Sequence, residues 1–109
     1  MVRVSVKRQD GAVAAVRVEG HTGSAPKGED IICAGVSALV QTFYFSVRRL
    51  LQVDAEADIR DGYFSFSVPS GLPPEKQEKV AFLAESMLIG LDEINRSYPG
   101  FLQVYDDGR

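Results

Sequence analysis

The sequence has a single cysteine and a single histidine among its 109 residues. One cysteine excludes an intramolecular disulfide, and the C-x-x-C spacing of dithiol redox proteins is absent. The pair also supplies too few ligands for zinc without carboxylates that nothing in the sequence places nearby. The opening MVRVSVKRQDG lacks the apolar stretch of a secretion signal. We therefore expect no metal, no cofactor and a reducing, cytoplasmic location.

Basic residues and long apolar runs are scarce as well. Twelve Lys and Arg stand against 15 Asp and Glu, a formal net charge of -3. Because nucleic-acid binding rests on a clustered excess of basic side chains, this balance predicts no direct nucleic-acid partner. The most apolar run, residues 31–47, is interrupted by polar side chains, so we interpret it as a buried helix and expect no membrane span.

Alternating apolar and polar residues predict two β-hairpins. The alternation covers residues 1–19 and returns over residues 53–68, as it does in half-buried strands. Each stretch is interrupted by an Asp-Gly pair, at residues 10–11 and 61–62, and such pairs favour tight hairpin turns. The second hairpin is therefore expected to begin near Val53.

Two helices and a closing strand complete the predicted order. Residues 31–52 hold no proline and one glycine, and their small residues would let another backbone approach closely: Ala34, Gly35, Ser37 and Ala38. After the breaker PSGLPP, apolar residues recur at three and four, which predicts an amphipathic helix ending near Tyr98. Residues 101–105 read as a short strand. The order ββαββαβ predicts one α+β domain over residues 1–109, with a mixed sheet packed against two long helices.

The cysteine stands where the central helix should begin. Asp30 occupies an N-cap position, so Cys33 falls in the first helical turn. Unpaired N–H groups and the helix dipole favour an anion there, and therefore favour the thiolate over the thiol. His21 closes the second predicted strand, and the loop that returns to the helix could bring its imidazole to the thiol as a base.

The loop between the two residues is rich in glycine. Gly20, Gly23 and Gly28 provide the freedom needed by a tight loop or by an active-site flap. A flexible connector has the same composition. The loop lacks the G-K-[ST] ending of a phosphate-binding P-loop, so a nucleotide site is a weak interpretation.

The residues alone leave structural interpretations open. A lone cysteine in IICAGVS is often a small core residue, and a lone histidine near a strand end often lies at the surface. We expect Asp30 to cap the helix and Ser37, one turn beyond Cys33, to pack and to bond back to a carbonyl. Either side chain could instead orient the histidine or contact the substrate.

The segment GHTGSAPKGEDIICAGVSAL closely resembles the signature of the ribosomal-processing cysteine protease family, Prp. That signature is Gly-His, a glycine-containing loop, then Asp-[Ile/Leu]-[Val/Ile]-Cys-[Ala/Ser]-[Ala/Gly]-Val-Ser. The match carries Gly20, His21, Gly28, Asp30, Cys33 and Ser37. Length and element order agree over nearly the whole chain. Pro26, in a loop expected to move, and Ile32, in place of the commoner valine, depart from the family pattern.

The resemblance implies an endopeptidase that removes the N-terminal extension of large-subunit ribosomal protein twenty-seven. Cys33 would be the nucleophile of an acyl-enzyme mechanism and His21 its base. It also implies a homodimer, and a loop that is mobile when empty and ordered around the precursor peptide. The alternative is a noncatalytic, ribosome-associated protein-binding module of the same fold, in which Cys33 only packs.

Overall fold

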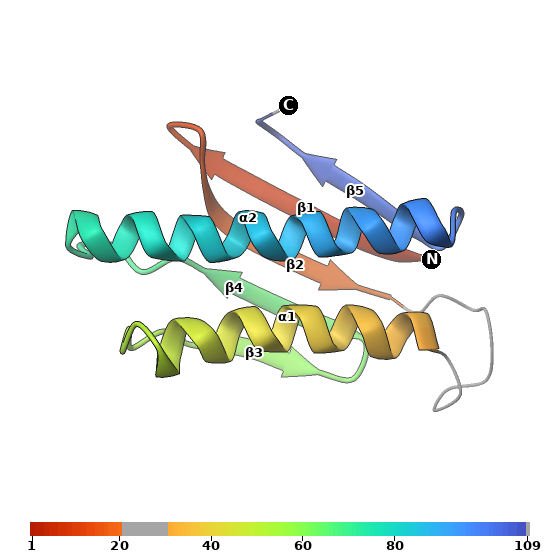
Figure 1. The fold of residues 1–109 in the computed structure, drawn as a ribbon, viewed down its shortest axis with the longest axis horizontal. Helices are drawn as coiled ribbons and strands as arrows, with labels where there is room; N and C mark the ends of the chain where they lie inside the picture. The colour runs from red at the N-terminus through yellow and green to blue at the C-terminus, as the bar shows by residue number, and fades with distance from the viewer. Residues whose placement is uncertain (21–30, 109) are drawn as a thin grey trace.

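The computed structural model describes residues 1–20 and 31–108, and its element order confirms the predicted α+β fold. The elements are β1 (Val2–Gln9), β2 (Ala12–Glu19), α1 (Ile31–Arg49), β3 (Ala57–Arg60), β4 (Tyr63–Ser67), α2 (Pro74–Ser97) and β5 (Leu102–Asp106). The five strands form one sheet in the order β3-β4-β2-β1-β5. β1 and β5 run parallel and the other neighbours antiparallel, so the sheet is mixed. Both helices lie on the same face of it (Figure 1).

The core fills the space between this sheet face and the helices. Inward-facing residues stand in register across the strands, with Val18 opposite both Val4 and Phe64. Phe66 lies in the neighbouring row, and the Phe43 ring of α1 meets its ring edge-on at 5.1 Å between centroids. All five side chains are buried. The outward residues of the same strands are mostly polar, and neither helix covers that side of the sheet.

Glycines let α1 and α2 pack closely. A Cβ at Gly35 would lie 3.4 Å from Ile94 Cδ1, and a Cβ at Gly90 would lie 2.9 Å from Leu39 Cδ2. At Gly35 the neighbouring atom therefore belongs to a side chain of α2 at contact distance, and not to another backbone as predicted. The other small residues of α1 line its outer face instead: Ala34, Ser37 and Ala38.

The prediction that the central helix continues to residue 52 was wrong. α1 ends at Arg49, and the Leu50 N–H still donates to the Ser46 carbonyl at 2.9 Å. Gln52 then adopts a left-handed φ of 54°, which a helix cannot accommodate. A polar, non-glycine residue in this conformation left no signal in the sequence.

The second hairpin also begins later than predicted, at Ala57 instead of Val53. Val53 and Ala55 are buried, which explains the alternation, but they pair with none of the strands in the described residues. The Tyr44 hydroxyl of α1 donates to the Ala55 carbonyl at 2.9 Å, so the segment is held against the helix. The alternation of apolar and polar residues before Ala57 therefore reflects the burial of every second side chain, and not pairing within a β-sheet. The closing strand is displaced by one residue from its predicted range.

Among the described residues, α1 is the one helix that is long and apolar enough to cross a bilayer, judged by length and composition alone. The core helix of a soluble protein meets the same criterion. One face of α1 is buried in the domain through Ile32, Val36, Val40, Phe43, Tyr44 and Val47. The opposite face is exposed, with Phe45 at 45%. The helix is therefore buried on one side only, where the sequence suggested a fully buried one.

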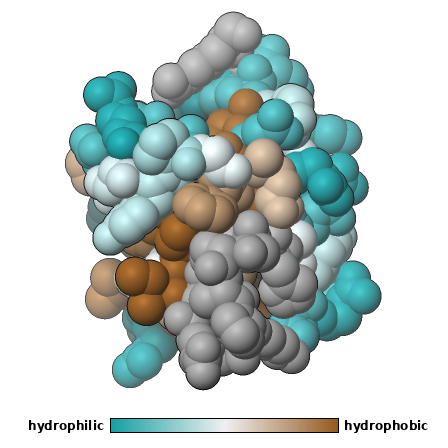
Figure 2. All heavy atoms as spheres, turned by 90° about the vertical axis from the view of Figure 1, so that its right-hand side faces the viewer, coloured by the Kyte–Doolittle hydropathy of each residue, from teal (hydrophilic) through white to brown (hydrophobic). Residues whose placement is uncertain are grey.

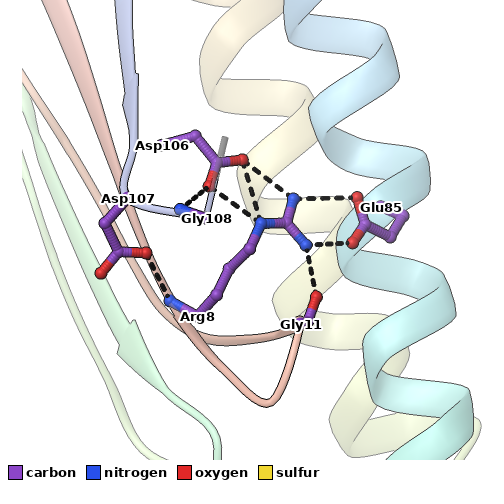
Figure 3. Close-up of polar contacts among 6 residues, drawn as sticks. All are labelled: Arg8, Gly11, Glu85, Asp106, Asp107 and Gly108. Atoms are coloured by element: carbon purple, nitrogen blue, oxygen red, sulfur yellow. Dashed lines mark hydrogen bonds and ion pairs between the residues drawn. The ribbon is translucent and has the colours of Figure 1, made fainter.

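An ion-pair cluster joins β1, α2 and β5 at the end of the sheet (Figure 3). The Arg8 side chain is 8% exposed, and its Nε lies 2.8 Å from Asp106 Oδ1 while Nη1 lies 2.6 Å from Glu85 Oε2. Nη1 also donates to the Gly11 carbonyl, and the Arg8 backbone N–H donates to the Asp107 carboxylate. These hydrogen bonds, first with Glu85 and then with Asp106, raise the pKa of Arg8 above its ordinary value. Arg8 thus ties the last strand and the second helix to the first hairpin.

Candidate active site

The start of α1, which carries Cys33, and the end of β2 lie at the same end of the molecule (Figure 1). Cys33 is the third residue of α1, so it belongs to the first turn, as predicted. Its side chain is half-buried and packs against the core. The dipole of an α-helix places positive potential at its first turn. An oxyanion formed beside this turn is therefore stabilised.

Ser37 stands one turn beyond Cys33 on α1. Its Oγ accepts a hydrogen bond from Gln41 Nε2 at 2.7 Å. Among the described residues, this bond takes the place of the expected bond back to a carbonyl of the preceding turn. Gln41 therefore fixes the Ser37 hydroxyl, and no feature of the sequence singled out Gln41.

Gly20 fixes the backbone that leads into His21. Its φ is 105°, and a Cβ at this position would overlap the carbonyl oxygen of Met1. Its N–H donates to the Gly62 carbonyl at 2.9 Å, in the turn between β3 and β4. Position 20 therefore requires glycine for two reasons, the backbone conformation and the close approach of Met1.

Four predicted site residues lie outside the described residues: His21, Gly23, Gly28 and Asp30. The described structure holds the positions on both sides of them, Gly20 at the end of β2 and Cys33 at the start of α1. Both elements reach the same end of the domain (Figure 1).

Alanine at position 20 is expected to destabilise the protein by about 2 kcal/mol, because a side chain there combines an unfavourable φ with a backbone overlap. Urea unfolding of Gly20→Ala measures the change. Gly11→Ala is the matched control: its φ of 81° is also left-handed, but a Cβ there would have no atom within 4 Å. The expected loss at Gly11 is about 1 kcal/mol. Equal losses at both positions would contradict a role for the Met1 contact.

Exposed apolar surface surrounds the start of α1. Ile31 is 72% exposed. Figure 2 views the molecule from this end and shows hydrophobic side chains gathered on the surface where α1 begins and α2 ends. An open hollow of about 740 Å³ follows the outer face of α1 from Ala34, the residue after Cys33, to Leu50. Surface of this kind suits an extended peptide or a second protein chain.

Among the described residues, no three His, Cys, Asp or Glu side chains lie close enough together to hold a metal ion. The chemistry that the described site offers is that of a thiol at a helix N-terminus.

Residues 1–103 match the family described as cysteine protease Prp. The chain belongs to the Prp family of cysteine proteases. It is 34% identical over 107 residues to the ribosomal processing cysteine protease Prp of Bacillus subtilis, covering 95% of this chain and 96% of that one. Membership in Prp makes the protein an enzyme of the cysteine protease class and disfavours the noncatalytic interpretation.

Two solved structures share the Prp fold. Both are of the essential ribosomal processing protease Prp from Staphylococcus aureus, one with a substrate peptide and one with a covalently linked product peptide. Their TM-scores are 0.81 and 0.80 at 21% and 23% identity, and each comparison covers 98% of this chain and 100% of the other. At this identity the likeness concerns the fold.

Proposed function

We propose that this protein is the endopeptidase that removes the N-terminal extension from the precursor of large-subunit ribosomal protein twenty-seven, in the cytoplasm. Cys33 is the nucleophile and His21 its base. The observation that carries the proposal is the place of Cys33, in the first turn of α1 in a chain that belongs to Prp along almost its whole length. The name of the Bacillus subtilis relative, ribosomal processing cysteine protease, supports a ribosomal protein as the class of substrate.

The reaction follows from the thiol and the helix start. His21 takes the thiol proton, and the Cys33 sulfur attacks the carbonyl carbon of the scissile bond. The carbonyl oxygen becomes an oxyanion, which backbone N–H groups of the first turn stabilise, that of Cys33 included. The intermediate expels the new amine, which takes the proton from His21, and a thioester remains. His21 then deprotonates water, whose attack breaks the C–S bond and frees the thiolate.

The thiol reaction with iodoacetamide tests the Cys–His pair without any knowledge of the substrate. Native Cys33 is expected to alkylate at pH 7 faster than the same cysteine in protein unfolded in guanidinium, because thiolate is the reactive form. His21→Ala should remove this advantage. Native Cys33 reacting more slowly than in the unfolded chain, as a packed core cysteine would, contradicts the assignment.

We also propose that the protein is a homodimer joined through the outer face of α1. Small residues at helical spacing line the hollow on this face, and Phe45 stands in it at 45% exposure. Small side chains let two helices approach closely, and an exposed aromatic residue supplies apolar area to an interface. The hollow begins at Ala34, one residue after Cys33 in the sequence, so such an interface would run along the helix that carries the nucleophile.

The oligomeric state is measured by light scattering after size exclusion. The wild type is expected at twice the chain mass of 11.9 kDa, and Phe45→Asp at the mass of one chain. Phe82→Asp is the matched control, because Phe82 is 76% exposed and lies on α2. A monomeric wild type, or a dimer disrupted by the α2 variant and not by Phe45→Asp, contradicts the proposal.

A further inference from the structure

The uncovered face of the sheet carries a continuous polar surface. In antiparallel and parallel ladders alike, residues opposite one another point to the same face. One outward row crosses all five strands and consists of Arg60, Tyr63, Glu19, Arg3 and Gln103. The next row consists of Asp58, Ser65, Arg17, Ser5 and Tyr105. Ser67, Ala15 and Lys7 form a third row on the inner three strands.

This face is basic although the whole chain is acidic. Four of its side chains are cationic and two are anionic: Arg3, Lys7, Arg17 and Arg60 against Glu19 and Asp58. Each anionic side chain is paired within its own strand, Glu19 with Arg17 at 3.7 Å and Asp58 with Arg60 at 3.0 Å.

The two cations that β1 contributes to this face, Arg3 and Lys7, are not neutralised in this way. Within the described part of the chain, Arg3 and Lys7 have no acidic partner, and both are exposed. The surplus of negative charge lies elsewhere, much of it on α2, which carries five acidic and three basic residues. The sheet face is therefore a local cationic surface that the net charge of -3 conceals.

Aromatic rings stand among these charges. Tyr63 is on β4, and the Arg60 guanidinium lies over its ring, 4.3 Å from the ring centroid. Tyr105 is 52% exposed on the edge strand β5, and its hydroxyl contacts Gln103 at 2.6 Å. From the spacing of strands and residues, the two tyrosines stand roughly 16 Å apart across the sheet. A ligand with several flat groups can therefore engage both.

We propose that the open sheet face, through Arg3, Lys7, Tyr63 and Tyr105, binds single-stranded RNA. Phosphates neutralise unpaired cations, and bases stack on aromatic rings of an exposed sheet, a mode that sheet-based RNA-binding domains use. An acidic protein would satisfy the cations but would make no use of the rings. The serine hydroxyls and the Gln103 amide on the same face can bond a ribose 2′-hydroxyl, which DNA lacks.

This surface complements the proposed function. The choice of RNA over DNA as its ligand rests in part on that function. A protease that acts on a ribosomal protein meets its substrate among RNA strands, and an RNA-binding face on the layer opposite the helices would leave Cys33 accessible. Binding itself is a separate property of the sheet and is measured without any cleavage.

The experiment is fluorescence anisotropy of a labelled 12-nucleotide single-stranded RNA titrated with the intact protein at several salt concentrations. Arg3→Gln/Lys7→Gln should weaken binding about tenfold and lower the slope of log affinity against log salt by about 1.4, near 0.7 for each phosphate that is no longer neutralised. Lys76→Gln/Lys79→Gln makes the same charge change on α2 and should alter affinity less than twofold. Tyr63→Leu should weaken binding about tenfold because bases no longer stack on the ring, and Tyr63→Phe should restore it.

Competitors identify the ligand class. Unlabelled RNA should displace the probe better than DNA of the same sequence, and both better than polyglutamate. Absence of binding, equal losses in the β1 and α2 double variants, or displacement by DNA or polyglutamate as effective as by RNA would each overturn the proposal. Thermal unfolding of every variant excludes misfolding as the cause. Because Arg3 and Lys7 are outside the proposed catalytic site, cleavage of a short peptide by their double variant reports on the protease separately.

Discussion

Replacing His21 by alanine is expected to reduce the rate of precursor cleavage by at least about 10³-fold while leaving the unfolding temperature unchanged. General acid and base catalysis contributes a factor of this size, and the sequence holds no second histidine to take over either role. Initial rates from quenched time courses measure the effect.

A double variant tells whether the two residues act as one unit. Residues of one catalytic unit are strongly non-additive, so Cys33→Ala/His21→Ala should be no slower than Cys33→Ala alone. Gln41→Ala, which removes the hydrogen bond to Ser37, should lose less than tenfold because Gln41 stands about two turns beyond Cys33 on α1. Full activity in His21→Ala would remove that residue from the mechanism.

Replacing Arg8 by alanine is expected to cost about 3 kcal/mol of unfolding free energy, which lowers the melting temperature by roughly 10–20 °C in a domain of this size. The loss arises because Asp106, with 10% side-chain exposure, keeps its charge after the opposite charge of the Arg8 guanidinium is removed. Glu85 is 38% exposed and regains water, so it adds less.

Urea unfolding measures this loss. The slope of the unfolding free energy against urea concentration should be the same for the wild type and the variant. Arg17→Ala is the matched control: Arg17 is 53% exposed and lies 3.7 Å from Glu19, so its replacement should change stability by less than about 0.5 kcal/mol. Arg8→Met combined with Asp106→Leu should recover much of the loss, since both buried charges are then removed together. Equal effects at Arg8 and Arg17 would contradict a structural role for the cluster.

The order of the elements could be predicted because each left a local period in the sequence, two for the strands and three to four for the helices. The order of the strands could not, because β5 joins the sheet beside β1 through contacts between opposite ends of the chain. Arg8 illustrates the limit: it follows three alternating valines as an inward residue, and Asp106 and Glu85, far along the chain, make its burial favourable.

The site divides in the same way. Gly20 and Cys33 were predicted from neighbouring residues, since a strand end and a helix start are local features. The contacts of Gly20 with Gly62 and Met1 depend on strand pairing and had no local signal. The basic sheet face was hidden for the same reason, because its charges come from separate strands and gather only once the register is known.

The proposed protease activity is tested most directly by incubating the protein with the full-length precursor of the organism's own ribosomal protein twenty-seven and following intact masses over time, with Cys33→Ala beside the wild type. We predict one cut near the precursor's N-terminus, made by the wild type alone. Cleavage by both proteins, or a precursor left intact by both, would contradict this activity.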